Sequence, residues 1–229
     1  MYQPMLFIHW KQSRLLLWPL VVAAFGLPLL AVQGLGSSAA DESFATAYAA
    51  VAGLSQWLPL FPVLAGAIGV TLGITAWNWD HQLNHVYALS LPLARWEYAM
   101  LKMGAGVALA FVPAAALWLG AHVAAASIAL PEGLHAYPNQ LALRFLLASV
   151  LSYALLFAMA AGTIKTTVWV ASSVLALFVF AGLMQEALGL SFPTLGFEQF
   201  SFVDATFEWL VRTGGPFEVF TGNWALIDV

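Results

Sequence analysis

Five long stretches without a charged residue constrain this chain more than any other feature. They cover residues 15–40, 43–79, 103–131, 145–164 and 166–185. A helix needs about 20 mainly apolar residues to cross the hydrocarbon core of a membrane, and it satisfies its backbone polar groups internally. Each stretch is long enough for one span. The pattern therefore predicts an all-α fold, a polytopic integral membrane helix bundle.

The expected spans can be placed within these stretches. The run 43–79 receives one span, because polar residues dilute its first part. Only 8% of the residues are charged, against roughly a quarter in soluble domains, so lipid must surround most of this surface. No repeat or low-complexity linker divides the chain, and residues 1–229 are expected to form a single transmembrane domain. The five expected spans are 15–32, 57–77, 103–125, 143–162 and 167–184.

Basic residues give these spans an orientation. With the N-terminus in the cytosol, the inside segments are 1–14, 78–102 and 163–166, which hold five of the seven basic residues. Lysine and arginine collect on the cytosolic side of membrane proteins. The chain is therefore expected to be a multi-pass protein of the cytoplasmic (inner) membrane with a cytosolic N-terminus.

Two segments outside the spans mix aromatic and charged residues. Residues 1–14 are predicted to be a cytosolic interfacial segment, either a helix in the headgroup plane or an irregular start to the first span. The first span is expected to be retained rather than cleaved as a signal peptide. Residues 185–229 combine acids with phenylalanine and tryptophan, which favours an outer-face segment docked at the interface.

Composition excludes several function classes. The formal net charge is −4, with no basic excess to favour nucleic acid as a partner. There is no cysteine, so thiol nucleophiles and thiolate metal sites are excluded. The string Gly162-Thr163-Ile164-Lys165-Thr166 lacks the glycines of an ATP-binding P-loop. No catalytic constellation is recognised, and the chain is expected not to be an enzyme.

Histidines are the remaining candidate ligands for a metal or haem. His81 and His85 lie four residues apart, a spacing that can bind a metal, but a partner-facing polar surface is the preferred interpretation. His122 lies within the third span, where an ionisable residue is a candidate functional group. A neutral histidine bonded to a neighbouring helix is preferred there. No metal site and no cofactor are assigned to this chain.

The cytosolic connection 78–102 is the most informative loop. Its first half has the spacing of a short helix, with Asp80 near the expected N-terminus, where a negative charge suits the helix dipole. Pro92 ends this helix. Arg95 and Lys102 stand where the next span emerges and are expected to extend toward the cytosolic surface. This loop is a candidate surface for a cytosolic partner.

The loop resembles the connection between the second and third spans of permeases in the type-two ABC exporter group. The residues that carry the resemblance are an acid, a leucine-rich helix ending in Leu-Pro-small-Arg, and a lysine opening the next span. The resemblance implies that residues 80–95 form a coupling helix against a separate cytosolic ATPase. The matching residues are Asp80, Leu91, Pro92, Ala94, Arg95 and Lys102. The residues expected to couple to the ATPase are Asp80, His81, Asn84, His85, Leu91, Pro92 and Arg95.

This family implies a set of partners. The ATPase subunits would act as a dimer and would bind ATP and Mg²⁺, while this chain would pair with a second copy or a related permease subunit within the lipid. The substrate-binding residues are unknown. Family members have six spans, so the five spans visible here imply a sixth that is missing or atypical. Two other functions stay open: a structural or anchoring subunit of a larger membrane complex, and a haem-bearing electron-transfer subunit using His122.

Overall fold

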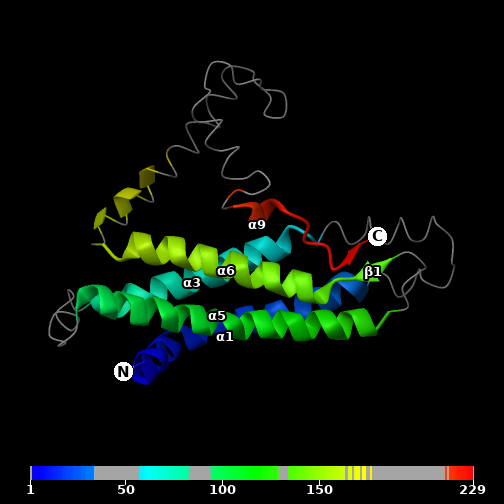
Figure 1. The fold of residues 1–229 in the computed structure, drawn as a ribbon, viewed down its shortest axis with the longest axis horizontal. Coiled ribbons are helices and arrows are strands. Elements are labelled where there is room, and N and C mark those ends of the chain that lie inside the picture. The colour runs from blue at the N-terminus through cyan, green and yellow to red at the C-terminus, as the bar shows by residue number, and fades with distance from the viewer. Residues whose placement is uncertain are drawn as a thin grey trace, which may run out of the picture. The chain divides into compact units, whose positions relative to one another are not determined.

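Figure 1 shows the computed structural model of this chain, whose described residues are mainly helical. The chain divides into two compact units, Met1–Ala158 with Asn223–Val229, and Met159–Gly222. The described residues are 2–33, 57–82, 94–128, 134–162, 165–166, 168–170, 172–173, 176, 215 and 217–228.

Four long helices dominate the described residues. They are α1 (Tyr2–Gln33), α3 (Leu60–Gln82), α5 (Arg95–Ala126) and α6 (Pro138–Ala160). All four are long and apolar enough to cross a membrane. The prediction of a mainly helical fold with several helices able to cross a membrane is thereby confirmed. Most of the expected span 167–184 lies outside the described residues, so a fifth and a sixth span stay predictions.

Successive helices of the first unit run in alternating directions. The start of α1, the end of α3, the start of α5 and the end of α6 meet at one end of the bundle (Figure 1). Lys11, Arg14, Arg95 and Lys102 belong to this end, which we call the basic end. Residues 134–138 and 223–228 lie at the opposite end.

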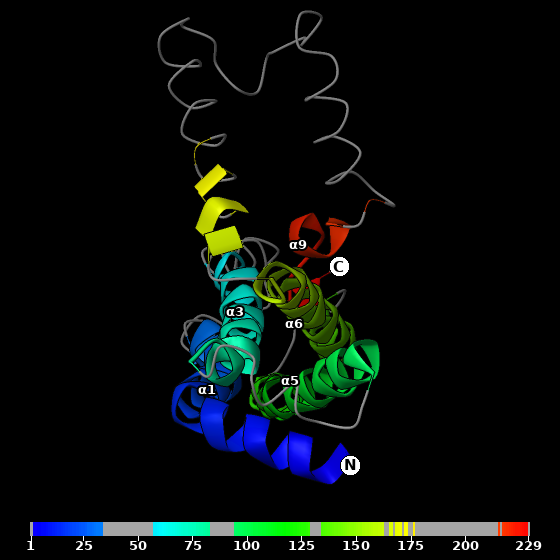
Figure 2. The ribbon, with the colours of Figure 1, turned by 90° about the vertical axis from the view of Figure 1, so that its left-hand side faces the viewer.

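The segment 1–14 joins the first span without a break, because α1 is helical from Tyr2 onward. Figure 2 shows the first turns of α1 running across the basic end, at an angle to the rest of the helix. Pro19 and Pro28 lie inside α1, where each removes a backbone donor and permits bending. The expected interfacial segment is thus the first part of a long helix.

Glycines allow the helices to approach closely. A Cβ added at Gly69 in α3 would lie 2.6 Å from the Ser149 carbonyl oxygen of α6, and one at Gly73 would lie 2.7 Å from the Leu156 Cβ. Gly106 of α5 lies directly against the Tyr153 ring of α6. Small residues bring membrane helices together in this way. Gly69 and Gly73 therefore serve packing of α3 against α6 within the chain.

Large apolar side chains lie on the outside of these helices. Leu15 is 82% exposed, Val63 66% and Leu143 58%, whereas alanines such as Ala65, Ala105 and Ala121 fill the interior. A soluble bundle would bury its largest apolar residues instead. Exposure of this kind on every long helix is consistent with a lipid environment.

A short antiparallel strand pair departs from the expected all-α fold. β1 (His135–Ala136) pairs with β2 (Ile227–Asp228), with His135 opposite Asp228. Close by, the Tyr137 N–H donates to the Leu226 carbonyl at 2.8 Å, and the Arg144 guanidinium donates to the Asn223 carbonyl. The apolar side chains of this segment, Trp224, Leu226 and Ile227, are buried. Residues 223–228 are thereby fixed beside the start of α6.

The second unit contributes the short helix α9 (Glu218–Thr221), whose end is closed by the Gly222 N–H donating to the Glu218 carbonyl at 2.9 Å. Residues 165–166, 168–170, 172–173 and 176 are helical. This unit also includes the end of α6 with residues 161–162, and residues 215, 217 and 222. Most of the predicted outer-face segment 185–229 lies outside the described part.

Candidate functional site

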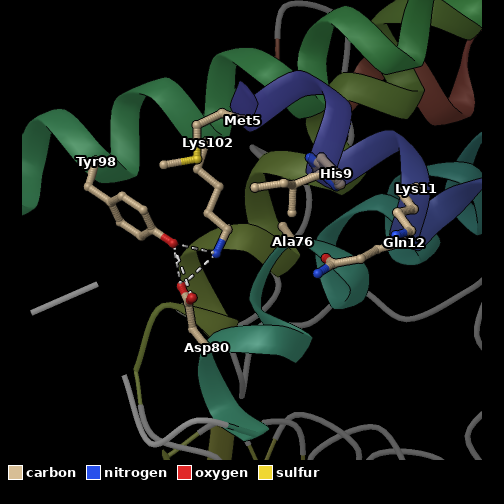
Figure 3. Close-up of a pocket in the computed structure, with 9 residues that line it drawn as sticks. Met5, His9, Lys11, Gln12, Ala76, Asp80, Tyr98 and Lys102 are labelled. Atoms are coloured by element: carbon tan, nitrogen blue, oxygen red, sulfur yellow. Dashed lines mark hydrogen bonds and ion pairs between the residues drawn. The ribbon is translucent and has the colours of Figure 1, made fainter. Parts of the chain in front are cut away.

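A buried ion pair joins α3 and α5 at the basic end. The Lys102 Nζ lies 2.6 Å from the Asp80 Oδ2, with side chains only 10% and 1% exposed (Figure 3). The Tyr98 hydroxyl also donates to Asp80, at 3.1 Å from each carboxylate oxygen. We call Asp80, Tyr98 and Lys102 the clamp. A buried charge pair persists only when further hydrogen bonds satisfy it, and Tyr98 meets that need.

Asp80 occupies an electrostatically unfavourable place. It lies near the end of α3, where the helix dipole presents its negative pole. The Lys102 ammonium offsets both charges, because it lies within hydrogen-bond distance of the carboxylate. The helix end and its acid therefore depend on a residue from α5.

Aromatic side chains enclose the lysine. The Lys102 Nζ lies 4.5 Å from the centroid of the Trp77 ring and 5.1 Å from that of Tyr98, within the range of cation–π attraction. The Trp77 indole N–H donates to the Phe157 carbonyl at 3.0 Å, and the Tyr153 hydroxyl donates to the Lys102 carbonyl at 3.2 Å. The clamp is thus fixed to α6 as well.

His9 connects α1 to the same region. It is buried, and its Nε2 lies 3.2 Å from the Leu72 carbonyl oxygen and 3.5 Å from the Thr75 hydroxyl of α3. The Ser13 hydroxyl, one turn later, donates to the His9 carbonyl at 2.9 Å. The angled start of α1 turns this side chain inward, toward α3.

A cavity of about 470 Å³ lies between the first turns of α1 and the clamp. One wall comes from α1, and the other from α3 and α5 (Figure 3). Its volume is within the range of small-molecule sites in proteins, about 300–1,000 Å³. The lining residues are Met5, Ile8, His9, Lys11, Gln12, Ala76, Asp80, Tyr98 and Lys102.

Two residues predicted to couple to an ATPase have described side chains. Asp80 was expected at the start of a short cytosolic helix, and this expectation is wrong. It lies near the end of α3, facing Lys102. Arg95 is the first residue of α5 and is exposed. His81 is described by its backbone alone. Asn84, His85, Leu91 and Pro92 fall within 83–93, outside the described residues.

Lys102 was expected to reach toward the cytosolic surface, and this expectation is wrong. Its ammonium instead turns inward, because the Asp80 carboxylate and the rings of Trp77 and Tyr98 stabilise its charge there. Sequence reasoning missed Tyr98. Its position four residues before Lys102 places both on one helix face, and this spacing was the available signal.

His122 differs in part from expectation. Its Nδ1 lies 2.9 Å from the Trp118 carbonyl oxygen, and its ring lies 4.5 Å from the Trp118 ring. Both contacts are within α5, whereas a bond to a neighbouring helix was predicted. Among the side chains that the structure describes, no three acids or histidines gather as metal ligands.

Comparisons of the chain with protein families, with curated proteins and with solved structures gave no match. We therefore interpret the site from its own geometry. The clamp brings together the two helices on either side of residues 83–93, and the cavity opens beside it.

Proposed function

We propose that this chain is the membrane-spanning permease subunit of an ATP-driven ABC transporter of the exporter type. A separate cytosolic ATPase dimer would bind ATP and Mg²⁺ and would act on the connection between α3 and α5. The permease would work with a second copy or a related subunit in the inner membrane, with its N-terminus in the cytosol. The chain itself would carry out transport and no catalysis.

The clamp is the observation that supports this proposal best. Asp80 is the first residue of the predicted coupling segment 80–95, and Tyr98 and Lys102 follow that segment, so the clamp joins the two ends of the connection between α3 and α5. A force applied to residues 83–93 would then reach α3 and α5 together. Rigid-body movement of packed helices is a common form of transport switch.

Arg95 is the residue that we propose contacts the ATPase. It is exposed at the start of α5 and ends the predicted coupling segment 80–95, whereas Lys102, two turns further along α5, is paired with Asp80. An exposed arginine with a planar fork of donors suits recognition of carboxylates on another protein. This division of roles, Arg95 for contact and the clamp for transmission, follows from their different burial.

Co-purification tests the proposal. The tagged chain, expressed in its native host and extracted in a mild detergent, is expected to bring down a P-loop ATPase, identified by mass spectrometry. Arg95→Glu should lower the recovered ATPase about tenfold or more, because reversing a charge at an interface places like charges together. Arg14→Glu, an exposed residue of α1, is the matched control and should recover the wild-type amount.

The contrary outcome is equally clear. If the wild-type chain recovers no P-loop ATPase, the transporter proposal fails. Recovery instead with a stable membrane complex that lacks an ATPase would favour the anchoring subunit.

A further inference from the structure

The cavity at the basic end combines two kinds of surface. Its apolar part is formed by Met5, Ile8 and Ala76, and its polar part by Lys11, Gln12 and the clamp. We propose that this cavity binds a phospholipid with an anionic headgroup, drawn from the leaflet that meets the basic end. The proposal does not depend on an ATPase partner.

The charges of the cavity favour an anion. Lys102 and Asp80 offset each other at 2.6 Å, so the clamp adds no net charge. Lys11 is exposed, and among the described side chains no acid forms an ion pair with it. One uncompensated positive charge therefore faces the cavity, and it complements a single phosphodiester.

Hydrogen-bond donors lie beside this charge. Figure 3 shows the Gln12 side chain extending from α1 toward Ala76, and both residues line the cavity. Its amide N–H groups would donate to a phosphate oxygen while the Lys11 ammonium pairs with the charge. A lysine and an amide on successive positions of one helix thus add polar groups to the lining, beside the apolar Met5, Ile8 and Ala76.

The apolar wall distinguishes a lipid from a soluble anion. Met5, Ile8 and Ala76 offer no hydrogen bonds, and they would leave a free phosphate partly unsolvated. They would instead contact the glycerol and first methylenes of a lipid. The cavity is partly open, and Ile8 in this wall is 39% exposed.

Tryptophans near the cavity support a position at the headgroup level of a membrane. Trp96, 67% exposed, and Trp10, in ring contact with Trp18, lie at the same end of the bundle. Tryptophan is enriched at the membrane–water interface. Basic clusters at this level attract anionic lipids.

Native mass spectrometry of the full chain tests this site. The protein is delipidated, incubated with equal amounts of phosphatidylglycerol and phosphatidylcholine, and its retained lipid is counted. We expect retention of phosphatidylglycerol over phosphatidylcholine. Lys11→Ala should reduce this retention about fivefold, the contribution of one basic residue near an anionic surface. Arg14→Ala removes another exposed charge, one that does not line the cavity, and it should leave retention within about twofold of wild type.

A second pair of variants tests the cavity itself. Ile8→Trp fills the open wall, whereas Phe7→Trp enlarges a neighbouring side chain that is 66% exposed and does not line the cavity. Only Ile8→Trp should lose phosphatidylglycerol. All four positions are exposed, and unchanged melting temperatures would show that the fold is intact.

Three outcomes would overturn the proposal. The first is equal retention of the two lipids by the wild-type protein. The second is an equal effect of Lys11→Ala and Arg14→Ala, which would indicate general surface attraction. The third is displacement of the bound lipid by millimolar inorganic phosphate, which would indicate a site for a soluble anion.

Discussion

At the scale of single residues, the clamp is the feature with the sharpest energetic consequence. Asp80 is 1% exposed and Lys102 8%, and removal of one member of a buried pair leaves an uncompensated charge. Such a loss costs about 3–5 kcal/mol, whereas removal of both members costs much less than the sum.

A double-mutant cycle makes this a prediction. Asp80→Ala and Lys102→Ala should each lower the free energy of unfolding in detergent by about 3 kcal/mol or more. The double variant should be destabilised by less than the two losses added together, with a coupling energy of about 1–3 kcal/mol. Lys11→Ala, at an exposed position, should change stability by less than about 0.5 kcal/mol. Strictly additive losses would show that the two side chains do not act as a pair.

Sequence reasoning reached the two charged members of the clamp, but neither their pairing nor Tyr98. Asp80 and Lys102 were both singled out, one as a helix-starting acid and the other as a surface lysine. Their contact spans 22 positions and depends on how α3 and α5 pack, which no local pattern encodes. The pairing could have been predicted most directly by requiring an oppositely charged partner for each charge at the end of a span.

At the scale of secondary-structure elements, close helix contacts depend on particular glycines. An added methyl at Gly120 would meet the Phe25 backbone of α1, and one at Gly106 would meet the Tyr153 ring. Gly26, also in α1, has nothing within 4 Å of the corresponding position.

Alanine substitution should separate these positions. Gly106→Ala and Gly120→Ala are expected to destabilise the protein by about 1–3 kcal/mol through overpacking. Gly26→Ala should be neutral or stabilising by up to about 1 kcal/mol, because alanine favours the helix. Chemical unfolding in detergent micelles, followed by circular dichroism, provides the measurement. If Gly26→Ala lowered the stability as much as Gly120→Ala does, the close contact of Gly120 with α1 would be contradicted.

Helices were more predictable than their ends. Uncharged runs located α1, α3, α5 and α6, because the hydrocarbon core requires such runs. Hydropathy does not mark where a helix continues past the core. Thus α5 begins at Arg95 rather than at residue 103, and α1 begins at Tyr2 rather than at residue 15. The pair β1–β2 has two residues on each side, too few for a period to be visible in the sequence.

At the scale of the whole molecule, the alternating directions of the helices separate two ends with different charge. The proposed orientation puts the basic end in the cytosol and the β1–β2 end outside. The chain contains no cysteine, so a single introduced cysteine would be a unique chemical label.

Labelling of intact cells tests this orientation. A membrane-impermeant maleimide should modify Gln140→Cys, at the exposed start of α6, and should leave Ala94→Cys, before α5, unmodified until the cells are opened. Both positions are exposed, so the difference reports sidedness rather than burial. The reverse pattern would place the basic end outside and would remove the basis for a cytosolic ATPase contact.

The clamp has one further consequence, for the response to membrane voltage. Work done by a transmembrane potential depends on the net charge that moves through the field, about 2.3 kcal/mol per elementary charge per 100 mV. Lys102 and Asp80 carry opposite charges 2.6 Å apart. A movement of α3 and α5 that keeps this pair intact carries no net charge from it, so the potential neither drives nor opposes that movement.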